Sequence, residues 1–365
     1  MANNALLDDV LRHLSTLVSF DTRNPPRRID CGGIFDYLQA ELRGFDHTLI
    51  DHGAGAVSLL SVRGKPTRLF NVHLDTVPSS EAWTGDPLVM RDLGDRVVGL
   101  GVCDIKGAAA AMLAVAARTA GDVALLFSSD EEANDARCIK AFLSSAHGFD
   151  EVIVAEPTQC GAVLAHRGIA SVRIAFTGTA GHASSADAMS LSAVHNGLHW
   201  GSAALRHIES LNHLRFGGLT GMRFNIGKIE GGIKANVIAP SAEFRFNFRP
   251  LPSTDVPALH ETLRTIATSA MPDAYEVTFA GPALPAGDIA SAEDSRLRAR
   301  DLADALNLPI GNAVDFWTEA SLFSEAGLTA MVFGPGDIAQ AHTADEWVLK
   351  SQLSTYAGHL MELFA

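Results

Sequence analysis

Three short apolar runs between residues 68 and 157 each end in polar or acidic residues, and longer stretches separate them. The runs read RLFNVHL (68–74), VALLFSS (123–129) and EVIVAEP (151–157), and the first gap holds an alanine-rich helical pattern that ends at Gly121. Apolar runs that alternate with helical patterns are typical of parallel strands joined by crossover helices. The sequence therefore predicts an α/β fold with a mixed, largely parallel sheet and helices on both faces.

A different pattern interrupts this one beyond residue 165. It begins with ASVRIAFTGTAGHASSAD, continues as one helical stretch over 190–212 and then alternates through EFRFNFRPLP, before the earlier pattern returns after about residue 280. A chain of 365 residues also exceeds the usual size of a single core. We expect a discontinuous domain formed by residues 1–165 and 281–365, and a smaller inserted α+β domain at 166–280.

Composition excludes several classes of protein. The formal net charge is −14 and no basic run is visible, which argues against a nucleic-acid partner. No apolar run could cross a bilayer, and the N-terminus reads as an amphipathic helix with early acids rather than as a signal peptide. The four cysteines form no C-x-x-C pair. We expect a cytoplasmic protein with reduced thiols and no membrane partner.

The first apolar run delivers His73 and Asp75 two positions apart. Side chains at this spacing on a strand point the same way, toward the carboxyl edge where open α/β sheets bind ligands. A metal-binding histidine usually has its ring held by a carboxylate, which Asp75 is spaced to provide. An isolated pair of this kind is more often a structural histidine, so the pair alone leaves both interpretations open.

Further acids gather at the same predicted edge. Asp104 follows a glycine-rich loop, Asp130, Glu131 and Glu132 follow the second run, and Glu156 ends the third. A late histidine, His342, again comes just after a predicted strand. Converging carboxylates repel one another unless cations compensate them, and carboxylates with histidine suit hard or borderline metal ions. The pattern therefore predicts a metal site.

Two competing sites have weaker support. The loop GLGVCDIKG lacks both the Walker lysine pattern and the dinucleotide fingerprint, which argues against phosphate binding. His195 and His199 have helical i, i+4 spacing, but HNGLH lacks the glutamate of H-E-x-x-H and a third ligand nearby. We interpret these two histidines as residues of a helix face or an interface.

Taken in order, the motifs H-L-D, G-x-G-x-x-D-x-K-G, D-E-E, E-P-T and a histidine after G-P-G resemble those of the two-metal aminoacyl hydrolases and exopeptidases. This family includes the acetylornithine and acetylcitrulline deacetylases, succinyl-diaminopimelate desuccinylase, aminoacylase and zinc carboxypeptidases. The resemblance covers nearly the whole chain. It implies two divalent ions, Zn or Co, of which one is bound by His73, Asp104 and Glu156 and the other by Asp104, Glu132 and His342.

The resemblance also implies how the catalytic groups act. Asp104 would bridge the two ions and precede a cis peptide bond to Ile105, and Asp75 would support His73. Glu131 would be the general base, although it could instead cap the following helix. His182 would reach across a homodimer, formed through the inserted domain, to stabilise the oxyanion in the partner's site.

Three residues are implied to bind the substrate: Asn236, Arg249 and Gly334. Asn247 stands two positions before Arg249, where the family often has an aspartate, which leaves the orientation of the arginine open. The implied reaction is metal-dependent hydrolysis of the amide of an N-acetyl-L-amino acid in arginine biosynthesis, N-acetyl-L-citrulline or N-acetyl-L-ornithine, with release of acetate. Alternatives are a succinyl-diaminopimelate desuccinylase, a metallo-exopeptidase, or a non-catalytic ligand-binding protein on this fold.

The substrate depends on residues outside the metal motifs. No additional basic cluster is visible beside them, which favours an acetyl over a succinyl group. In DFWTEASLF, Glu319 replaces the aspartate common in the family, and Asp315 and Trp317 lie close by. An unpaired acid would favour the ammonium of ornithine, whereas acids held in local hydrogen bonds beside an aromatic ring would suit the neutral ureido group of citrulline.

Overall fold

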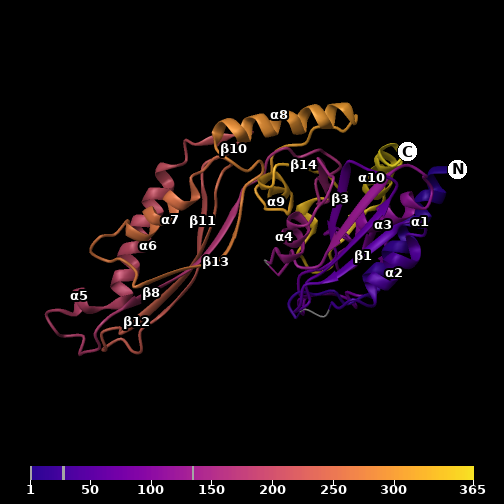
Figure 1. Ribbon diagram of the computed structural model, residues 1–365. Coiled ribbons are helices and arrows are strands. Elements are labelled where there is room, and N and C mark those ends of the chain that lie inside the picture. The colour runs from indigo at the N-terminus through magenta and orange to yellow at the C-terminus, as the bar shows by residue number, and fades with distance from the viewer. Residues whose placement is uncertain (1, 27–28, 134) are drawn as a thin grey trace. The chain divides into compact units, whose positions relative to one another are not determined.

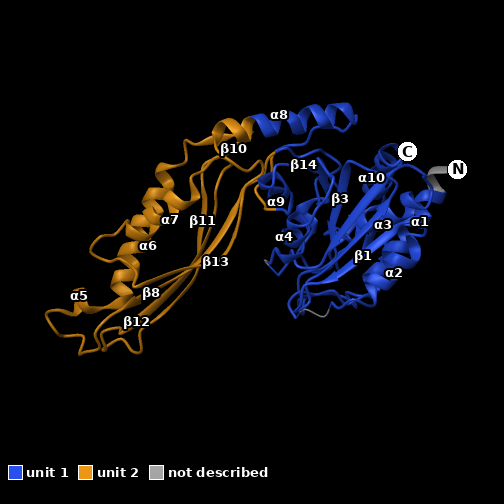
Figure 2. Ribbon diagram, in the orientation of Figure 1, with its two compact units in different colours: residues 1–164, 294–312, 318–365 blue, residues 165–293, 313–317 orange. Residues whose placement is uncertain are grey.

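The computed structural model describes residues 2–26, 29–133 and 135–365 and divides the chain into two compact units (Figure 2). Unit 1 comprises Met1–Leu164, Asp294–Asn312 and Thr318–Ala365, and unit 2 comprises Ala165–Glu293 and Ala313–Trp317. The expected second boundary at residue 281 thus falls inside unit 2. The unit continues to Glu293 because Ala292, near the start of α8 (Ile289–Ala305), packs in a cluster with Phe216, Leu219 and Leu251.

Unit 1 is built on a six-stranded sheet with the order β1-β2-β6-β3-β7-β14 (Figure 1). Strands β6, β3, β7 and β14 are parallel, and β2 is antiparallel to both of its neighbours. The predicted mixed, largely parallel sheet is therefore confirmed. The strands are β1 (Asp46–Asp51), β2 (Val57–Arg63), β3 (Arg68–His73), β6 (Val123–Ser128), β7 (Glu151–Val154) and β14 (Thr329–Val332).

Helices cover both faces of this sheet (Figure 1). On one face α1 (Ala2–Ser19), α3 (Lys106–Ala116) and α10 (Lys350–Leu363) pack against one another, and on the other face α4 (Arg137–Ser144) contacts α9 (Ala320–Glu325). Every residue of α3 is buried, because its alanines let the neighbouring helices approach closely. Unit 1 also contains α2 (Ile34–Glu41), the 3-10 helix η1 (Ile338–Gln340), and a small sheet of β15 (Trp347–Leu349), β5 (Arg96–Val98) and β4 (Arg91–Asp92).

The alanine-rich helix is shorter than the sequence predicts. It ends at Ala116 instead of Gly121, and the Ala116 carbonyl accepts a hydrogen bond from Arg63 Nη1 at 2.9 Å. The guanidinium of Arg63 also binds the carbonyl of Gly121 at 2.8 Å. The side chain of Arg63, at the end of β2, thus binds carbonyl groups that a longer helix would contain. The apolar periodicity of the helical stretch cannot reveal this contact, because Arg63 is distant in the sequence.

Unit 2 is an antiparallel sheet with the order β11-β12-β8-β13 and two helices, α6 and α7, on one face (Figure 1). Phenylalanines of β12 alternate with polar residues, so one face packs against the helices and the other is open. The elements are β8 (Ile169–Thr177), β11 (Arg223–Gly231), β12 (Ser241–Arg249), β13 (Ala274–Gly281), α5 (Ala188–Leu191), α6 (Ala193–Ser210), α7 (Val256–Thr265) and the short pair β9 (Arg215–Phe216) and β10 (Leu219–Thr220).

The helical stretch predicted over residues 190–212 is two helices. Helix α5 ends at Leu191, and Ser192 leaves helical geometry and caps α6 by accepting a hydrogen bond from the backbone N–H of His195. Serine is a favoured residue at this position because its hydroxyl satisfies a free backbone donor. Among the described residues, no helix combines the length and apolar character needed to cross a membrane.

Candidate metal centre

The predicted ligands meet at the carboxyl edge of the parallel strands in unit 1. His73 is the last residue of β3, Glu132 lies in the turn after β6, and Glu156 follows the end of β7. His342 comes from the long segment after β14, and Asp104 precedes α3. Parallel strands bring their carboxyl ends to one edge, so five segments distant in the sequence supply side chains to one place.

These side chains form two groups that share Asp104. His73 Nε2 lies 3.2 Å from Asp104 Oδ1 and 3.8 Å from Glu156 Oε1. His342 Nε2 lies 3.1 Å from Asp104 Oδ2 and 3.0 Å from Glu132 Oε1. Each oxygen of the Asp104 carboxylate therefore faces a different histidine, which is the arrangement that a bridging carboxylate requires.

Each group has the composition and size of a metal site. The possible ligand atoms of His73, Asp104 and Glu156 lie within 4.8 Å of one another, and so do those of Asp104, Glu132 and His342. One imidazole and two carboxylates suit zinc and similar divalent ions. The residues present thus fit two adjacent ions that share one ligand.

The protonation of the groups follows from their burial and their mutual contacts. The hydrogen bonds that the His342 imidazole donates to the carboxylates of Asp104 and Glu132 raise the pKa of His342 to about 11. Burial by itself would lower the pKa of His73, but contacts with Asp104 and Asp75 outweigh it and raise that pKa. The two histidine contacts in turn overcome burial at Asp104 and lower its pKa. The carboxylates of the site therefore favour the protonated, positively charged form of His73 and His342.

Backbone geometry at two ligands is unusual. His342 has φ of 55°, in the left-handed region that non-glycine residues rarely adopt. The peptide bond between Asp104 and Ile105 is cis, as the family resemblance implies. Residues held in a sparsely populated conformation such as that of His342 often belong to functional sites.

Glu131 lies next to the predicted ligand Glu132 in the sequence but belongs to neither group of possible metal ligands. Burial raises the pKa of its carboxyl, and the nearby charges of Glu132, Glu156 and Asp104 raise it further. Among the described residues, none forms a hydrogen bond with its carboxylate, whereas Glu132 is held by His342. The two neighbouring glutamates thus have different environments, and Glu131 keeps a carboxylate available for proton transfer.

Asp75 connects the histidine strand to the glutamate turn. The His73 ring nitrogen Nδ1 lies 3.0 Å from the carbonyl oxygen of Asp75 and 3.5 Å from its carboxylate oxygen Oδ1. The other carboxylate oxygen accepts hydrogen bonds from the backbone N–H of Glu132 at 2.9 Å and from Asn24 Nδ2 at 3.2 Å. Asp75 thus contacts one ligand directly and fixes the backbone of another, and Asn24 is a participant that sequence reasoning missed because no strand or motif marks it.

Gly334 supports a ligand through close packing. A Cβ atom at this position would lie 2.5 Å from the carbonyl oxygen of Glu156, so only glycine fits. Its own N–H donates to Thr158 Oγ1 at 3.0 Å, and its carbonyl accepts from the backbone N–H of Cys160 at 2.8 Å. Gly334 therefore fixes the backbone around Glu156, and its contact with a substrate stays a prediction.

The predicted catalytic residue His182 and the predicted substrate-binding residues Asn236 and Arg249 lie in unit 2, at opposite ends of its sheet. His182 and Asn236 are exposed neighbours, because His182 bridges to Val237 and the backbone N–H of Ala183 donates to the carbonyl of Asn236. Arg249 ends β12, whose first residue is Ser241. A strand of nine residues spans roughly 26 Å, which separates Arg249 from the other two by more than the length of a small acyl amino acid.

Asn247 orients Arg249. Its Oδ1 atom accepts a hydrogen bond from Arg249 Nε at 3.1 Å, and its Nδ2 atom donates to Ser171 Oγ at 3.2 Å. Asparagine can therefore hold the guanidinium from the position where the family often has aspartate. The amide does so without placing a negative charge beside the arginine.

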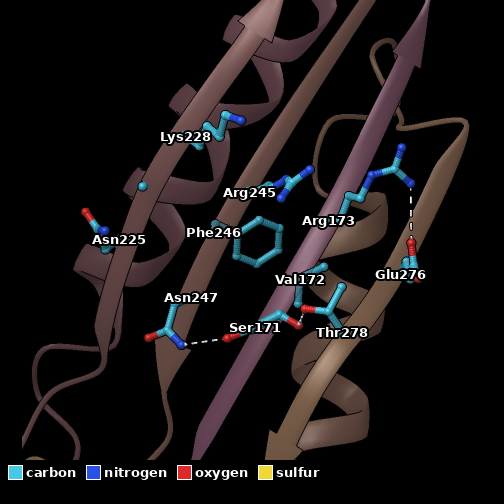
Figure 3. Close-up of a pocket in the computed structure, with 11 residues that line it drawn as sticks. Ser171, Val172, Arg173, Asn225, Lys228, Arg245, Phe246, Asn247, Glu276 and Thr278 are labelled. Atoms are coloured by element: carbon cyan, nitrogen blue, oxygen red, sulfur yellow. Dashed lines mark hydrogen bonds and ion pairs between the residues drawn. The ribbon is translucent and has the colours of Figure 1, made fainter. Parts of the chain in front are cut away.

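The open face of the sheet in unit 2 has a basic row that sequence reasoning missed. Lys228, Arg245 and Arg173 lie side by side on β11, β12 and β8, with Glu276 next on β13 (Figure 3). The row borders a hollow of about 570 Å³. Every one of these basic side chains pairs with an acid, and Glu243 accepts from both arginines. Three strands contribute one residue each, and β8 is distant in sequence from β11 and β12, so no motif could show the row.

In the segment thought to select the substrate both acids make local contacts, and one oxygen of Glu319, Oε1, has no hydrogen-bond partner among the described residues. The buried Arg167 binds Asp315, which Arg223 also contacts at 3.5 Å. Trp317 packs against Phe279 and donates from Nε1 to a backbone carbonyl at 3.0 Å. In unit 1, Glu319 is buried, accepts a hydrogen bond from a serine hydroxyl at 2.8 Å, and has its pKa raised by burial to about 8.

The structure brings no third possible ligand to His195 and His199 among the described residues. In the described part of the chain, the groups of three or more possible metal ligands are the two that share Asp104, and neither includes His195 or His199. His195 Nδ1 lies 3.3 Å from a backbone carbonyl, and His199 is exposed on α6. This agrees with their interpretation as residues of a helix face.

Comparisons with known proteins agree with this geometry. The chain is 66% identical to N-acetyl-L-citrulline deacetylase from Xanthomonas campestris pv. campestris over 354 residues, 96% of each chain. It is 29% identical to acetylornithine deacetylase from Myxococcus xanthus over 92% of this chain and 91% of that protein. A dinuclear metal binding peptidase from Bacillus subtilis, YXEP, has the same fold, with a TM-score of 0.65 at 14% identity over 99% of this chain and 98% of that one. The model of the peptidase family M20/M25/M40 matches residues 69–365, and the chain belongs to this family.

Proposed function

We propose that this protein is a metal-dependent deacetylase that hydrolyses the amide of an N-acetyl-L-amino acid in arginine biosynthesis, with N-acetyl-L-citrulline as its preferred substrate. The observation that carries the proposal is the pair of ligand groups joined through the two oxygens of Asp104. Two divalent ions, Zn or Co, would be held there by the five ligands. When bound, such ions lower the pKa of a water molecule and polarise the scissile carbonyl.

The residues of the chain then divide the remaining work. Glu131 takes a proton from the attacking water and gives it to the leaving amine, as its raised pKa and its free carboxylate suit. Asp75 holds His73 and the backbone of Glu132 in place. Arg249 binds the α-carboxylate of the substrate in the orientation that Asn247 gives it.

Two observations support citrulline over ornithine. The relative that is 66% identical is named for the citrulline derivative, whereas the acetylornithine deacetylase is only 29% identical. In addition, Asp315 is paired with Arg167, and burial raises the pKa of Glu319 to about 8, so neither acid supplies an unpaired negative charge for the ammonium of ornithine. The neutral ureido group needs no such counter-charge.

A homodimer formed through unit 2 is part of the proposal. Because His182 and Arg249 of one chain are too far apart for one small substrate, we infer that His182 and Asn236 serve the active site of a partner. Apolar side chains on α5, α6, β11 and the following turn are exposed: Met189 66%, Leu198 54%, Leu205 48%, Ile229 53% and Ile233 75%. Strand β11 is also an edge of its sheet in the described residues. An exposed edge with apolar neighbours suits pairing with a second copy.

The compartment is proposed on the state of the thiols. All four cysteines are free, and Cys103, Cys138 and Cys160 are buried. Disulfides persist mainly in oxidising compartments, so four free cysteines agree with a cytoplasmic enzyme. The substrate is a small molecule, and we propose no nucleic-acid or membrane partner.

The test compares kcat/KM for three amides: N-acetyl-L-citrulline, N-acetyl-L-ornithine and N-succinyl-L,L-diaminopimelate. The protein is first dialysed against a chelator and then restored with zinc or cobalt. We expect activity only after metal is restored and the highest kcat/KM for the citrulline derivative. A preference for either other substrate would refute the substrate assignment, and restored protein that hydrolyses none of a panel of acyl amino acids and dipeptides would favour a binding protein.

A further inference from the structure

The side chain of Glu346 is buried, with 1% exposed, and it is surrounded by backbone donors of the loop that ends at the bridging aspartate. Its Oε1 atom accepts hydrogen bonds from the N–H of Cys103 at 2.8 Å and of Asp104 at 3.0 Å. Its Oε2 atom accepts from the N–H of Gly101 at 3.0 Å. Three backbone groups within four residues thus share one carboxylate as their acceptor.

The loop needs such an anchor because it has no strand partner of its own at these residues. Gly101 has φ of +81°, and a Cβ atom there would lie 2.8 Å from Thr76 Cγ2. Turns that point successive N–H groups to one place form concave sites for an anion. The Glu346 carboxylate therefore fixes the backbone from which the Asp104 side chain projects.

Glu346 also belongs to the segment that supplies the histidine ligand. It lies four residues after His342, and its own carbonyl accepts a hydrogen bond from Gly99 at 3.1 Å. Between them, Asp345 has φ of 55° and accepts from the backbone N–H of Thr84 at 3.2 Å. The His342 segment is thus anchored to unit 1 immediately before Glu346, and the carboxylate joins it to the Asp104 loop.

A second buried charge lies nearby but has a different partner. Lys106 is fully buried, and its ammonium donates to the carbonyl of Phe20 at 3.0 Å. The backbone N–H groups of the Asp104 loop, not this ammonium, are therefore the hydrogen-bond donors to Glu346. The contacts of Glu346 act on the position of a ligand rather than on a helix or a core.

We propose that Glu346 is a positioning residue of the metal centre, which sets the Asp104 carboxylate at the correct distance from His342 so that one side chain can bridge two ions. The inference rests on the proposed function, because it requires that the two groups bind metal. Residues that orient metal ligands typically contribute 10- to 100-fold to metal affinity or activity.

The test removes the charge of the Glu346 side chain while keeping its shape. In Glu346→Gln, one oxygen becomes an NH₂ group that faces a backbone N–H, whereas Glu346→Asp keeps the charge on a shorter stem. Asp122→Asn is the matched control, because the Asp122 carboxylate also accepts a backbone N–H, from Lys65 at 3.0 Å, at the start of β6 and thus at the opposite edge of the sheet. Each chelator-treated variant is titrated with Co²⁺ by calorimetry, and its absorption spectrum, its Tm without metal, kcat and KM are measured.

We expect wild-type protein to bind two ions and Glu346→Gln to bind one of them roughly 10- to 100-fold more weakly, with a similar loss in kcat and little change in KM. The cobalt spectrum should change, and Glu346→Asp should recover part of the affinity. Asp122→Asn should keep the metal affinities and the spectrum of the wild type, whatever its Tm.

Three results would overturn the inference. One is a Glu346→Gln variant with wild-type affinities and kcat. Another is an equal loss in Asp122→Asn, which would make the effect one of general stability. If Glu346→Gln does not fold, the test rests on Glu346→Asp, whose shorter side chain withdraws the carboxylate from the backbone donors. Wild-type metal affinity in that variant would also refute the inference. Wild-type protein that binds no metal would instead refute the proposed function on which the inference rests.

Discussion

Asp104 has the most demanding position in the centre, because its two carboxylate oxygens face two different histidines at 3.2 and 3.1 Å. In protein without metal, protons on His73 and His342 balance the surrounding carboxylates, and the pKa of His342 is raised to about 11. An imidazole must lose its proton before it can bind a metal. The same contacts that place the ligands therefore make protons compete with metal.

This competition predicts a pH dependence of metal binding. Below its raised pKa, His342 holds a proton that each binding event must release, so the apparent affinity should increase as the pH rises from 6 to 8. Calorimetric titration with Co²⁺ in two buffers of different ionisation enthalpy measures both the affinity and the number of protons released. Binding that releases no protons, or an affinity that is constant over this range, would contradict the protonation assigned to the histidines.

Glu131 should be required for turnover but not for metal binding. We expect Glu131→Gln to bind both ions and to lose several orders of magnitude in kcat, because the amide cannot accept the proton of the water while all five ligands remain. Metal analysis and steady-state kinetics on the same preparation check both parts. Near-normal turnover would contradict the role of Glu131 as general base, and loss of one ion would indicate that Glu131 is a metal ligand.

At the scale of elements, the strand-end rule explains which parts of the site the sequence could predict. His73 ends a recognisable strand, and Glu132 and Glu156 each follow one, so their convergence could be predicted from parallel topology alone. Glu346 and Asn24 could not, because they reach the site through loops whose paths depend on packing. The basic row on unit 2 was missed for a related reason, since its cross-strand neighbours are not close in sequence: Lys228 and Arg245 are 17 positions apart, and Arg245 and Arg173 are 72 apart.

Two glycines of α6 give a matched test of how this helix packs on β12. A Cβ atom at Gly197 would lie 2.3 Å from Phe244 Cε2, whereas one at Gly201 would meet Ile226 Cδ1 at 3.5 Å, an ordinary contact. Gly197→Ala should therefore destabilise the protein by about 1–3 kcal/mol, because overcrowding outweighs the gain in helix propensity. Gly201→Ala should stabilise it by up to about 1 kcal/mol.

Urea unfolding followed by tryptophan fluorescence measures both effects, because Trp200 lies between the two glycines and packs against Phe244. The free energies of unfolding should change with opposite signs. Equal changes in the two variants would show that the close contact between α6 and β12 does not limit the residue at position 197.

At the scale of the whole molecule, the predicted site residues are divided between the two units. Unit 1 contains all five predicted metal ligands and Glu131, whereas unit 2 contains His182, Asn236 and Arg249. Within unit 2, the length of β12 keeps His182 and Asn236 away from Arg249. A single chain therefore cannot bring all three to one small substrate through unit 2, and in the proposed homodimer a second copy would provide His182 and Asn236.

Subunit mixing tests this arrangement. Glu131→Gln and His182→Ala chains should each be nearly inactive, but a heterodimer has one site in which Glu131 of one chain meets His182 of the other. Random exchange in an equal mixture should then restore about a quarter of the wild-type activity, since half of the dimers are mixed and each has one complete site. The control replaces His182→Ala with the double variant Glu131→Gln/His182→Ala, which leaves no complete site. No recovery after exchange is confirmed by differently tagged chains would show that His182 acts within its own chain or not at all.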